Sequence, residues 1–260
     1  MTMPIFPPSE DPGSNFNELV KKMGLVPSLT SWSESLSVPH ATTCVALRFS
    51  EGVLGAGDRR ATSGNWISHR GLEQVLQTDE FSAVAISGAA GPAMEMIKMF
   101  ALILEHYEKM EGRSLSLEGK ANQLSMLVRS NLPAAMSGMV VLPLFAGFDE
   151  HDAQGRIWDY DATGGRYEER EYVAIGSGSM HAGTVIKVGW KNSLTATDAV
   201  HLACRSLWEA SEADSGTGGP DGLRGVYPIV AIIDQNGWRK IADSELAAIF
   251  ESIANEVKSR

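Results

Sequence analysis

Short apolar runs bounded by glycine or other turn residues predict β-strands along most of the chain. Glu51-Gly52 and Gly164-Gly165 are two of these turn signals. The predicted strands cover residues 43–49, 53–56, 81–86, 140–148, 156–160 and 226–233.

Longer segments carry apolar residues at helical spacing and predict four helices. They cover residues 92–109, 117–136, 198–213 and 243–257. Ser116 and Thr197 are predicted to cap the second and third helices, and Pro133 should bend or end the second. The order of strands, two helices, strands and helices indicates an α+β sandwich of two sheets with helices on each outer face.

The first forty residues have a different composition from the rest. Proline and glycine are frequent in residues 4–13, and serine is frequent in residues 28–37. This composition predicts a weakly ordered leader. Because core-like patterning begins at Thr42, we divide the chain into a leader, 1–41, and a catalytic domain, 42–260.

Charge and composition restrict the classes of function. The net charge of −10 argues against nucleic acid and anionic membranes as partners. The longest apolar stretch, 93–104, is interrupted by Glu95 and Lys98, so no membrane span is expected. The N-terminus does not resemble a secretory signal. With only Cys44 and Cys204, neither at metal-ligand spacing, the sequence indicates a reducing cytoplasm and no bound metal.

The pair Thr42-Thr43 at the start of the first strand is the first candidate for chemistry. A threonine that becomes the first residue of a chain has a free α-amine, with a pKa of about 8, beside its own hydroxyl. That amine can accept the hydroxyl proton, so one residue supplies both nucleophile and base. Without further context, the pair is a weak signal and is better interpreted as two β-branched residues that open a strand.

Several motifs follow this pair in a fixed order. They are Gly57-Asp58-Arg59-Arg60, Ile86-Ser87-Gly88, Glu105-His106-Tyr107-Glu108-Lys109, Gly176-Ser177-Gly178-Ser179 and Asp214-Ser215-Gly216-Thr217-Gly218-Gly219-Pro220-Asp221. With Thr42-Thr43, this set resembles proteasome β subunits of the actinobacterial 20S type, from Thr42 to the end of the chain. The resemblance implies the four-layer αββα sandwich of N-terminal-nucleophile hydrolases, threonine endopeptidase activity and no cofactor.

The resemblance also implies roles for individual residues. Thr42 matches the nucleophile that autocleavage of the leader exposes, and Asp58 matches the acidic group that orients the site. Gly88 matches the glycine whose N–H forms the oxyanion hole. Ser177, Asp214 and Thr217 match a hydrogen-bonding cluster near the new α-amine; the alternative for these three is ordinary turn and cap chemistry.

Substrate contacts are implied by the same resemblance. Thr62 matches a residue that pairs backbone-to-backbone with the substrate strand. The first specificity pocket would be lined by small and apolar residues, which favours apolar residues before the cut. These residues, which could equally be ordinary core, are Ala61, Leu72, Leu76, Ile86, Ala90 and Met94.

Two positions depart from the family pattern. Gln74 stands where the family has a lysine that pairs with the acid matched by Asp58, and Ala41 stands where the family has glycine before the nucleophile. Glutamine donates hydrogen bonds but carries no charge, and alanine restricts the backbone that self-cleavage needs. Arg70 and Lys98 are candidate substitute cations.

Two main hypotheses remain open from the sequence. The first is a cytoplasmic threonine endopeptidase that degrades unfolded proteins in stacked seven-membered rings, with α subunits, other β subunits and a ring-shaped ATPase unfoldase as partners. The second is an inactive structural β subunit that keeps its leader. A more distant third is an amidase of the same fold acting on a small molecule.

Overall fold

The structure is a computed structural model and describes residues 42–63 and 65–259. The predicted leader, 1–41, and Ala41 within it therefore lie outside the described residues. No helix in the described ranges is long and apolar enough to cross a membrane.

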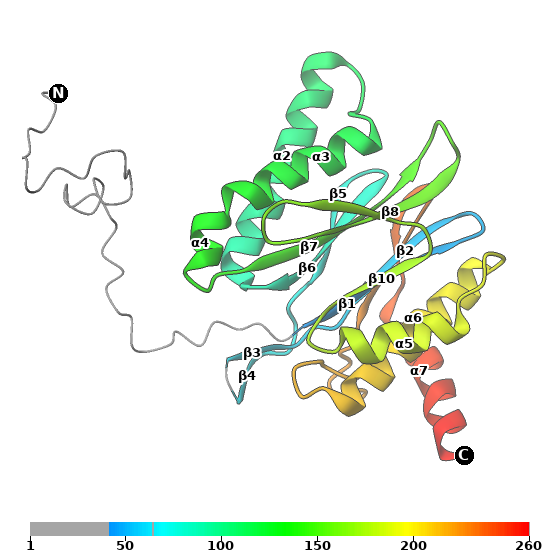
Figure 1. The fold of residues 1–260 in the computed structure, drawn as a ribbon. Helices are drawn as coiled ribbons and strands as arrows, with labels where there is room; N and C mark the ends of the chain where they lie inside the picture. The colour runs from blue at the N-terminus through cyan, green and yellow to red at the C-terminus, as the bar shows by residue number, and fades with distance from the viewer. Residues whose placement is uncertain (1–41, 64, 260) are drawn as a thin grey trace, which may run out of the picture. The chain divides into compact units, whose positions relative to one another are not determined.

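Two five-stranded antiparallel sheets form the centre of the fold (Figure 1). In strand order, the first sheet comprises β10 (Tyr172–Gly176), β1 (Thr43–Phe49), β2 (Gly52–Gly57), β11 (Ile229–Asp234) and β12 (Gly237–Lys240). The second comprises β5 (Val75–Asp79), β6 (Ser82–Gly88), β7 (Val141–Asp149), β8 (Gln154–Tyr160) and β9 (Arg166–Glu169). A separate two-stranded ribbon joins β3 (Ala61–Ser63) to β4 (Trp66–His69).

Helices cover the outer face of each sheet, as Figure 1 shows. The helices beside the second sheet are α2 (Ala90–Glu111), α3 (Leu117–Ser130) and α4 (Leu132–Met136). Those beside the first sheet are α5 (Ser179–Gly189), α6 (Ala196–Ala213) and α7 (Asp243–Lys258).

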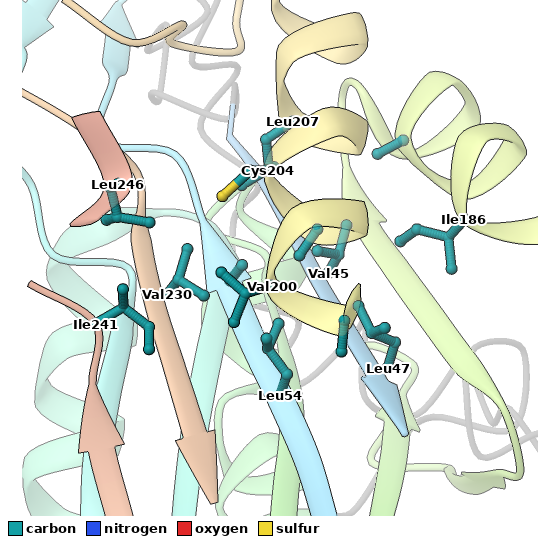
Figure 2. Packing of buried hydrophobic residues seen from close by; sticks show 14 of the residues in the cluster. Val45, Leu47, Leu54, Ile186, Val200, Cys204, Leu207, Val230, Ile241 and Leu246 are labelled. Atoms are coloured by element: carbon teal, nitrogen blue, oxygen red, sulfur yellow. The ribbon is translucent and has the colours of Figure 1, made fainter. Parts of the chain in front are cut away.

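Three separate layers of buried apolar side chains hold these elements together. Between the first sheet and α5, α6 and α7, residues such as Val45, Leu54 and Val200 pack against one another (Figure 2). A second layer, which includes Val53 and Leu144, fills the space between the two sheets. A third joins the second sheet to α2 and α3. Three cores between four layers confirm the predicted αββα sandwich.

The predicted elements are largely confirmed, and the differences have local causes. The second predicted helix is interrupted at Asn131, between α3 and α4, next to Pro133. Ser116 caps α3 as predicted, because its hydroxyl accepts from Gly119 N. The prediction of Thr197 as a cap is wrong: α6 begins at Ala196, and the Thr195 hydroxyl accepts from Asp198 N.

Seven elements were not predicted from the sequence. The strands β3, β4, β9 and β12 have only three or four residues each, and β4 is exposed throughout. The others are β5, β10 and α5. These segments are too short, or too mixed in polarity, to show a clear period of their own.

Candidate active site

Thr42 lies directly before β1 and is held there by the end of β10. Its carbonyl oxygen accepts a hydrogen bond from Ser177 N at 2.9 Å. Gly176 has φ +98°, and a Cβ at this position would lie 1.8 Å from the Thr42 carbonyl oxygen. Only glycine permits this approach, so the Gly176-Ser177 sequence fixes the position of the Thr42 backbone.

The end of β6 reaches the same region. A Cβ on Gly176 would also lie 3.2 Å from the Ser87 hydroxyl, which places Ser87-Gly88 beside the Gly176 backbone. Gly88 has φ +109°, and a Cβ there would lie 2.2 Å from the Val140 carbonyl oxygen. The structure thus brings the predicted oxyanion-hole glycine next to the strand end that holds Thr42.

Asp58, directly after β2, is fully buried and accepts three backbone hydrogen bonds. Thr43 N donates to Oδ1 at 3.0 Å, and Arg60 N and Gly218 N donate to Oδ2 at 3.1 and 2.6 Å. Burial raises the pKa of Asp58 to about 7, although these N–H groups and the Arg60 charge oppose the shift. The carboxyl group therefore changes charge near neutral pH.

Gln74 is buried, but its carboxamide is engaged with groups other than Asp58. Its Nε2 donates to the Arg60 carbonyl oxygen at 2.9 Å, and the Cys44 thiol lies 3.8 Å from its Oε1. Cys44 itself is buried in the core between the sheets, as predicted. The position where the family carries a lysine thus contributes no charge to Asp58.

An arginine that was not among the candidate cations acts on Asp58. The positive charge of Arg60 lowers the pKa of the Asp58 carboxyl group. Arg70 lines a cavity of about 390 Å³ together with Arg59 and Arg60, and Lys98 is exposed on α2. Arg60 is therefore a further candidate cation, and the roles of Arg70 and Lys98 stay predictions.

Ser177, Asp214 and Thr217 form the cluster that the sequence predicted. The Ser177 and Thr217 hydroxyls each donate to Asp214 Oδ2 at 2.6 Å. Burial raises the pKa of Asp214, but these hydrogen bonds and nearby N–H groups outweigh it, so the pKa lies below its ordinary value. Asp214 is a carboxylate at neutral pH.

Thr43 belongs to the same cluster, and sequence reasoning assigned it no role beyond opening the strand. Its hydroxyl lies 2.6 Å from the Thr217 hydroxyl and accepts from Gly178 N at 2.9 Å. These partners are 174 and 135 residues away in sequence. The only sequence signal was the threonine pair itself, because no local spacing reports such distant contacts.

The predicted substrate-binding residues fall into two groups. Leu76, Ile86 and Met94 pack together in the core between the second sheet and α2, whereas Ala61, Leu72 and Ala90 are not part of a described core cluster. Thr62 lies in β3 and pairs with Ile67 of β4. Among the described strands β3 pairs with β4 alone, and the pairing of Thr62 with a substrate strand stays a prediction.

The described residues also include no group of three or more histidine, cysteine, aspartate or glutamate side chains that could hold a metal ion.

Comparison with known proteins agrees with this arrangement. The sequence signature of the family described as "Proteasome subunit" matches residues 38–221. A protein named "Proteasome subunit beta" from Acidimicrobium ferrooxidans is 51% identical over 100% of this chain and 96% of its own length. Proteins of the same name from Acidothermus cellulolyticus and Jonesia denitrificans are 48% and 45% identical. They cover 83% and 94% of this chain, and 76% and 83% of their own lengths. With the αββα sandwich and the residues gathered around Thr42, these matches show that the chain belongs to the proteasome subunit family, as one of its β-type members.

Proposed function

We propose that this chain is a threonine-type endopeptidase whose nucleophile is the Thr42 hydroxyl, freed when the bond between Ala41 and Thr42 is cut. One observation carries the proposal: groups from three separate segments converge on Thr42 and on Thr43, the first residue of β1. Asp58 binds Thr43 N, Ser177 N binds the Thr42 carbonyl oxygen, and Thr217 binds the Thr43 hydroxyl.

The proposed reaction uses only groups of this chain and water. The α-amine of Thr42 takes the proton from the Thr42 hydroxyl, and the oxygen attacks the carbonyl carbon of the substrate peptide bond. The Gly88 N–H stabilises the negative charge on the tetrahedral intermediate. The Thr42 ammonium then gives its proton to the substrate amine as the peptide C–N bond breaks, and water hydrolyses the remaining ester to restore Thr42.

We also propose that the chain works inside an assembly. Its relatives are named as subunits, and α2 and α3 carry exposed apolar side chains, including Met99, Leu102 and Met126. Burial of such residues between neighbouring copies would stabilise a ring. Stacked rings with α subunits outside, a ring-shaped ATPase feeding them, and unfolded cytoplasmic proteins as substrates complete this proposal.

One observation favours a second candidate, an inactive structural β subunit. Gln74 supplies no charge beside Asp58, whose pKa of about 7 leaves the carboxyl group partly protonated at neutral pH. Loss of a nearby opposite charge shifts a pKa by one to three units, each equivalent to about 1.4 kcal/mol. Such a loss slows the reaction by orders of magnitude if the charge is needed in the transition state.

Intact mass and one substitution separate the two candidates. The endopeptidase predicts that the assembled protein has the mass of Thr42 to Arg260 and that Thr42→Ala lowers peptide hydrolysis at least about a thousandfold. Thr184→Ala, which removes an exposed hydroxyl on α5, is the matched control and should retain the activity.

Two results would contradict the endopeptidase. If the assembled protein has the mass of Met1 to Arg260, its α-amine is still in a peptide bond and the structural candidate is correct. If hydrolysis persists in Thr42→Ala, another residue is the nucleophile.

A further inference from the structure

The Thr43 hydroxyl joins three segments that are far apart in sequence. Thr43 lies at the start of β1, Gly178 precedes α5, and Thr217 follows α6. Gly178 N donates to Thr43 Oγ1 at 2.9 Å, and the Thr43 and Thr217 oxygens are 2.6 Å apart. Thr217 in turn contacts Asp214.

The direction of this hydrogen-bond chain follows from the number of protons available. Asp214, a carboxylate, can only accept, so the single hydroxyl hydrogen of Thr217 is donated to it. Thr217 Oγ1 must then be the acceptor in its contact with Thr43, and Thr43 the donor. The chain therefore runs from Gly178 N–H through Thr43 and Thr217 to Asp214.

The hydrogen-bond chain is too tightly packed for another group to replace the hydroxyls of Thr43 and Thr217. Thr43 and Thr217 are both 0% exposed. A Cβ on Gly178 would lie 2.5 Å from each of their hydroxyl oxygens. Loss of the Thr43 hydroxyl would therefore leave the buried Gly178 N–H without an acceptor and Thr217 without a donor.

We propose that Thr43 is a positioning residue of the active site: by donating to Thr217, its hydroxyl holds Thr217 toward Asp214 and so fixes the cluster around the Thr42 amine. The inference rests on the proposed endopeptidase function. Thr43 acts through Thr217 and Asp214 rather than on the substrate. The Ser177 hydroxyl, bound to the same Asp214 oxygen, connects the cluster to Thr42 through the Ser177 N–H.

Thr43→Val tests the proposal because valine keeps the shape of threonine and removes the hydroxyl. We expect kcat for a peptide substrate to fall about 10- to 100-fold, with KM within a factor of about two because no substrate contact is lost. Thr43→Ser, which keeps the hydroxyl, should recover most of kcat. The proposal is overturned if Thr43→Val has the wild-type kcat, if only KM changes, or if both variants lose activity equally.

Thr217→Val removes the next link and carries the test if Thr43→Val does not fold. It should give the same loss of kcat at unchanged KM, and a wild-type kcat overturns the proposal. Where both variants fold, the double variant should be little slower than either single one, because both changes break one chain. Fully multiplicative losses would show that the two hydroxyls act independently and would overturn the proposal.

Hydrogen exchange separates failure of this inference from failure of the proposed function. If the wild-type protein shows no hydrolysis that depends on Thr42, the endopeptidase proposal fails, but the hydrogen-bond chain can still be measured. The peptide that contains Gly178 should then exchange faster in Thr43→Val than in Thr43→Ser. Equal exchange in the two variants would overturn the chain itself.

Discussion

Two carboxyl groups flank the start of β1, and their pKa values move in opposite directions. Asp58 is fully buried and accepts three backbone N–H groups, yet burial raises its pKa to about 7. Asp214 is only half-buried and accepts the hydroxyls of Ser177 and Thr217. Burial raises its pKa less than these donors lower it, and the net shift is downward.

The difference shows that hydrogen-bond donors alone do not decide the charge of a carboxyl group. Three N–H groups stabilise the Asp58 carboxylate, but they do not replace both water and a facing cation. Solvent still reaches Asp214, so the two hydroxyl hydrogen bonds and the nearby backbone N–H groups are sufficient there. Under the proposed function, a missing positive charge would matter on the Asp58 side of the site, and position 74 is where the resemblance places that charge.

The strongest test of this contrast is to restore the charge with Gln74→Lys. A lysine ammonium near Asp58 would favour the carboxylate and lower its pKa by about one to three units. We expect peptide hydrolysis at pH 7 to rise about 10- to 1,000-fold, and the acid side of the pH–rate profile to move to lower pH. Both are measured as kcat/KM between pH 5 and pH 9.

Gln74→Met is the matched control, because methionine is similarly long and carries no charge. It should give no acceleration and no shift of the profile. If Gln74→Lys behaves like the methionine variant while remaining folded, the charge at position 74 has no role, and the contrast between the two sides of the site is not catalytic.

The opposite pKa shifts also predict opposite effects of pH on stability. Between the unfolded pKa of 3.8 and about 7, the folded state keeps the Asp58 proton and the unfolded state does not. This contribution to the free energy of unfolding is complete below pH 3.8 and is lost as pH rises toward 7, by on the order of 4 kcal/mol. Asp58→Asn should remove that slope in urea unfolding measured from pH 4 to pH 8.

Asp214 should act in the other direction. Because its folded pKa lies below 3.8, its stabilising contribution is present above that pH and is lost as pH falls through the folded value. Asp214→Asn should therefore reduce the fall in the free energy of unfolding at acid pH. It should leave the pH dependence of that free energy between pH 4 and pH 7 unchanged. Equal slopes in the Asp58→Asn variant and the wild type would show that Asp58 is ionised throughout.

Much of this arrangement could be predicted from the sequence, for identifiable reasons. The long apolar runs of β1, β7 and α6 gave clear periods, and the motifs around Asp58, Gly88 and Asp214 are short and specific. Gly88 was singled out from its motif, and its φ of +109° explains why glycine stands there; its role in an oxyanion hole stays a prediction.

Other features depend on contacts that a sequence does not display. The Thr43 hydroxyl is bound by residues more than 130 positions away, so its role was not predicted. The hydrogen bond from Gln74 Nε2 to the Arg60 carbonyl oxygen, 14 residues away, is another contact of this kind. The same holds for Arg60, whose charge lowers the pKa of Asp58 and which was not among the predicted cations.

The smallest expected effect is that of a substitution at Thr217 that keeps the hydroxyl. It changes the Asp214 side of the site without removing a hydrogen-bond donor. Thr217→Ser keeps the donor to Asp214 and loses one buried methyl group, which costs about 1 kcal/mol of stability. Hydrolysis should fall less than about threefold, because the hydrogen bonds that lower the pKa of Asp214 remain. If Thr217→Ser lowered the rate of hydrolysis as much as Thr217→Val does, the methyl group of Thr217 would be the group that positions the hydroxyl. The contrast with Asp58 would then depend on packing as much as on donors.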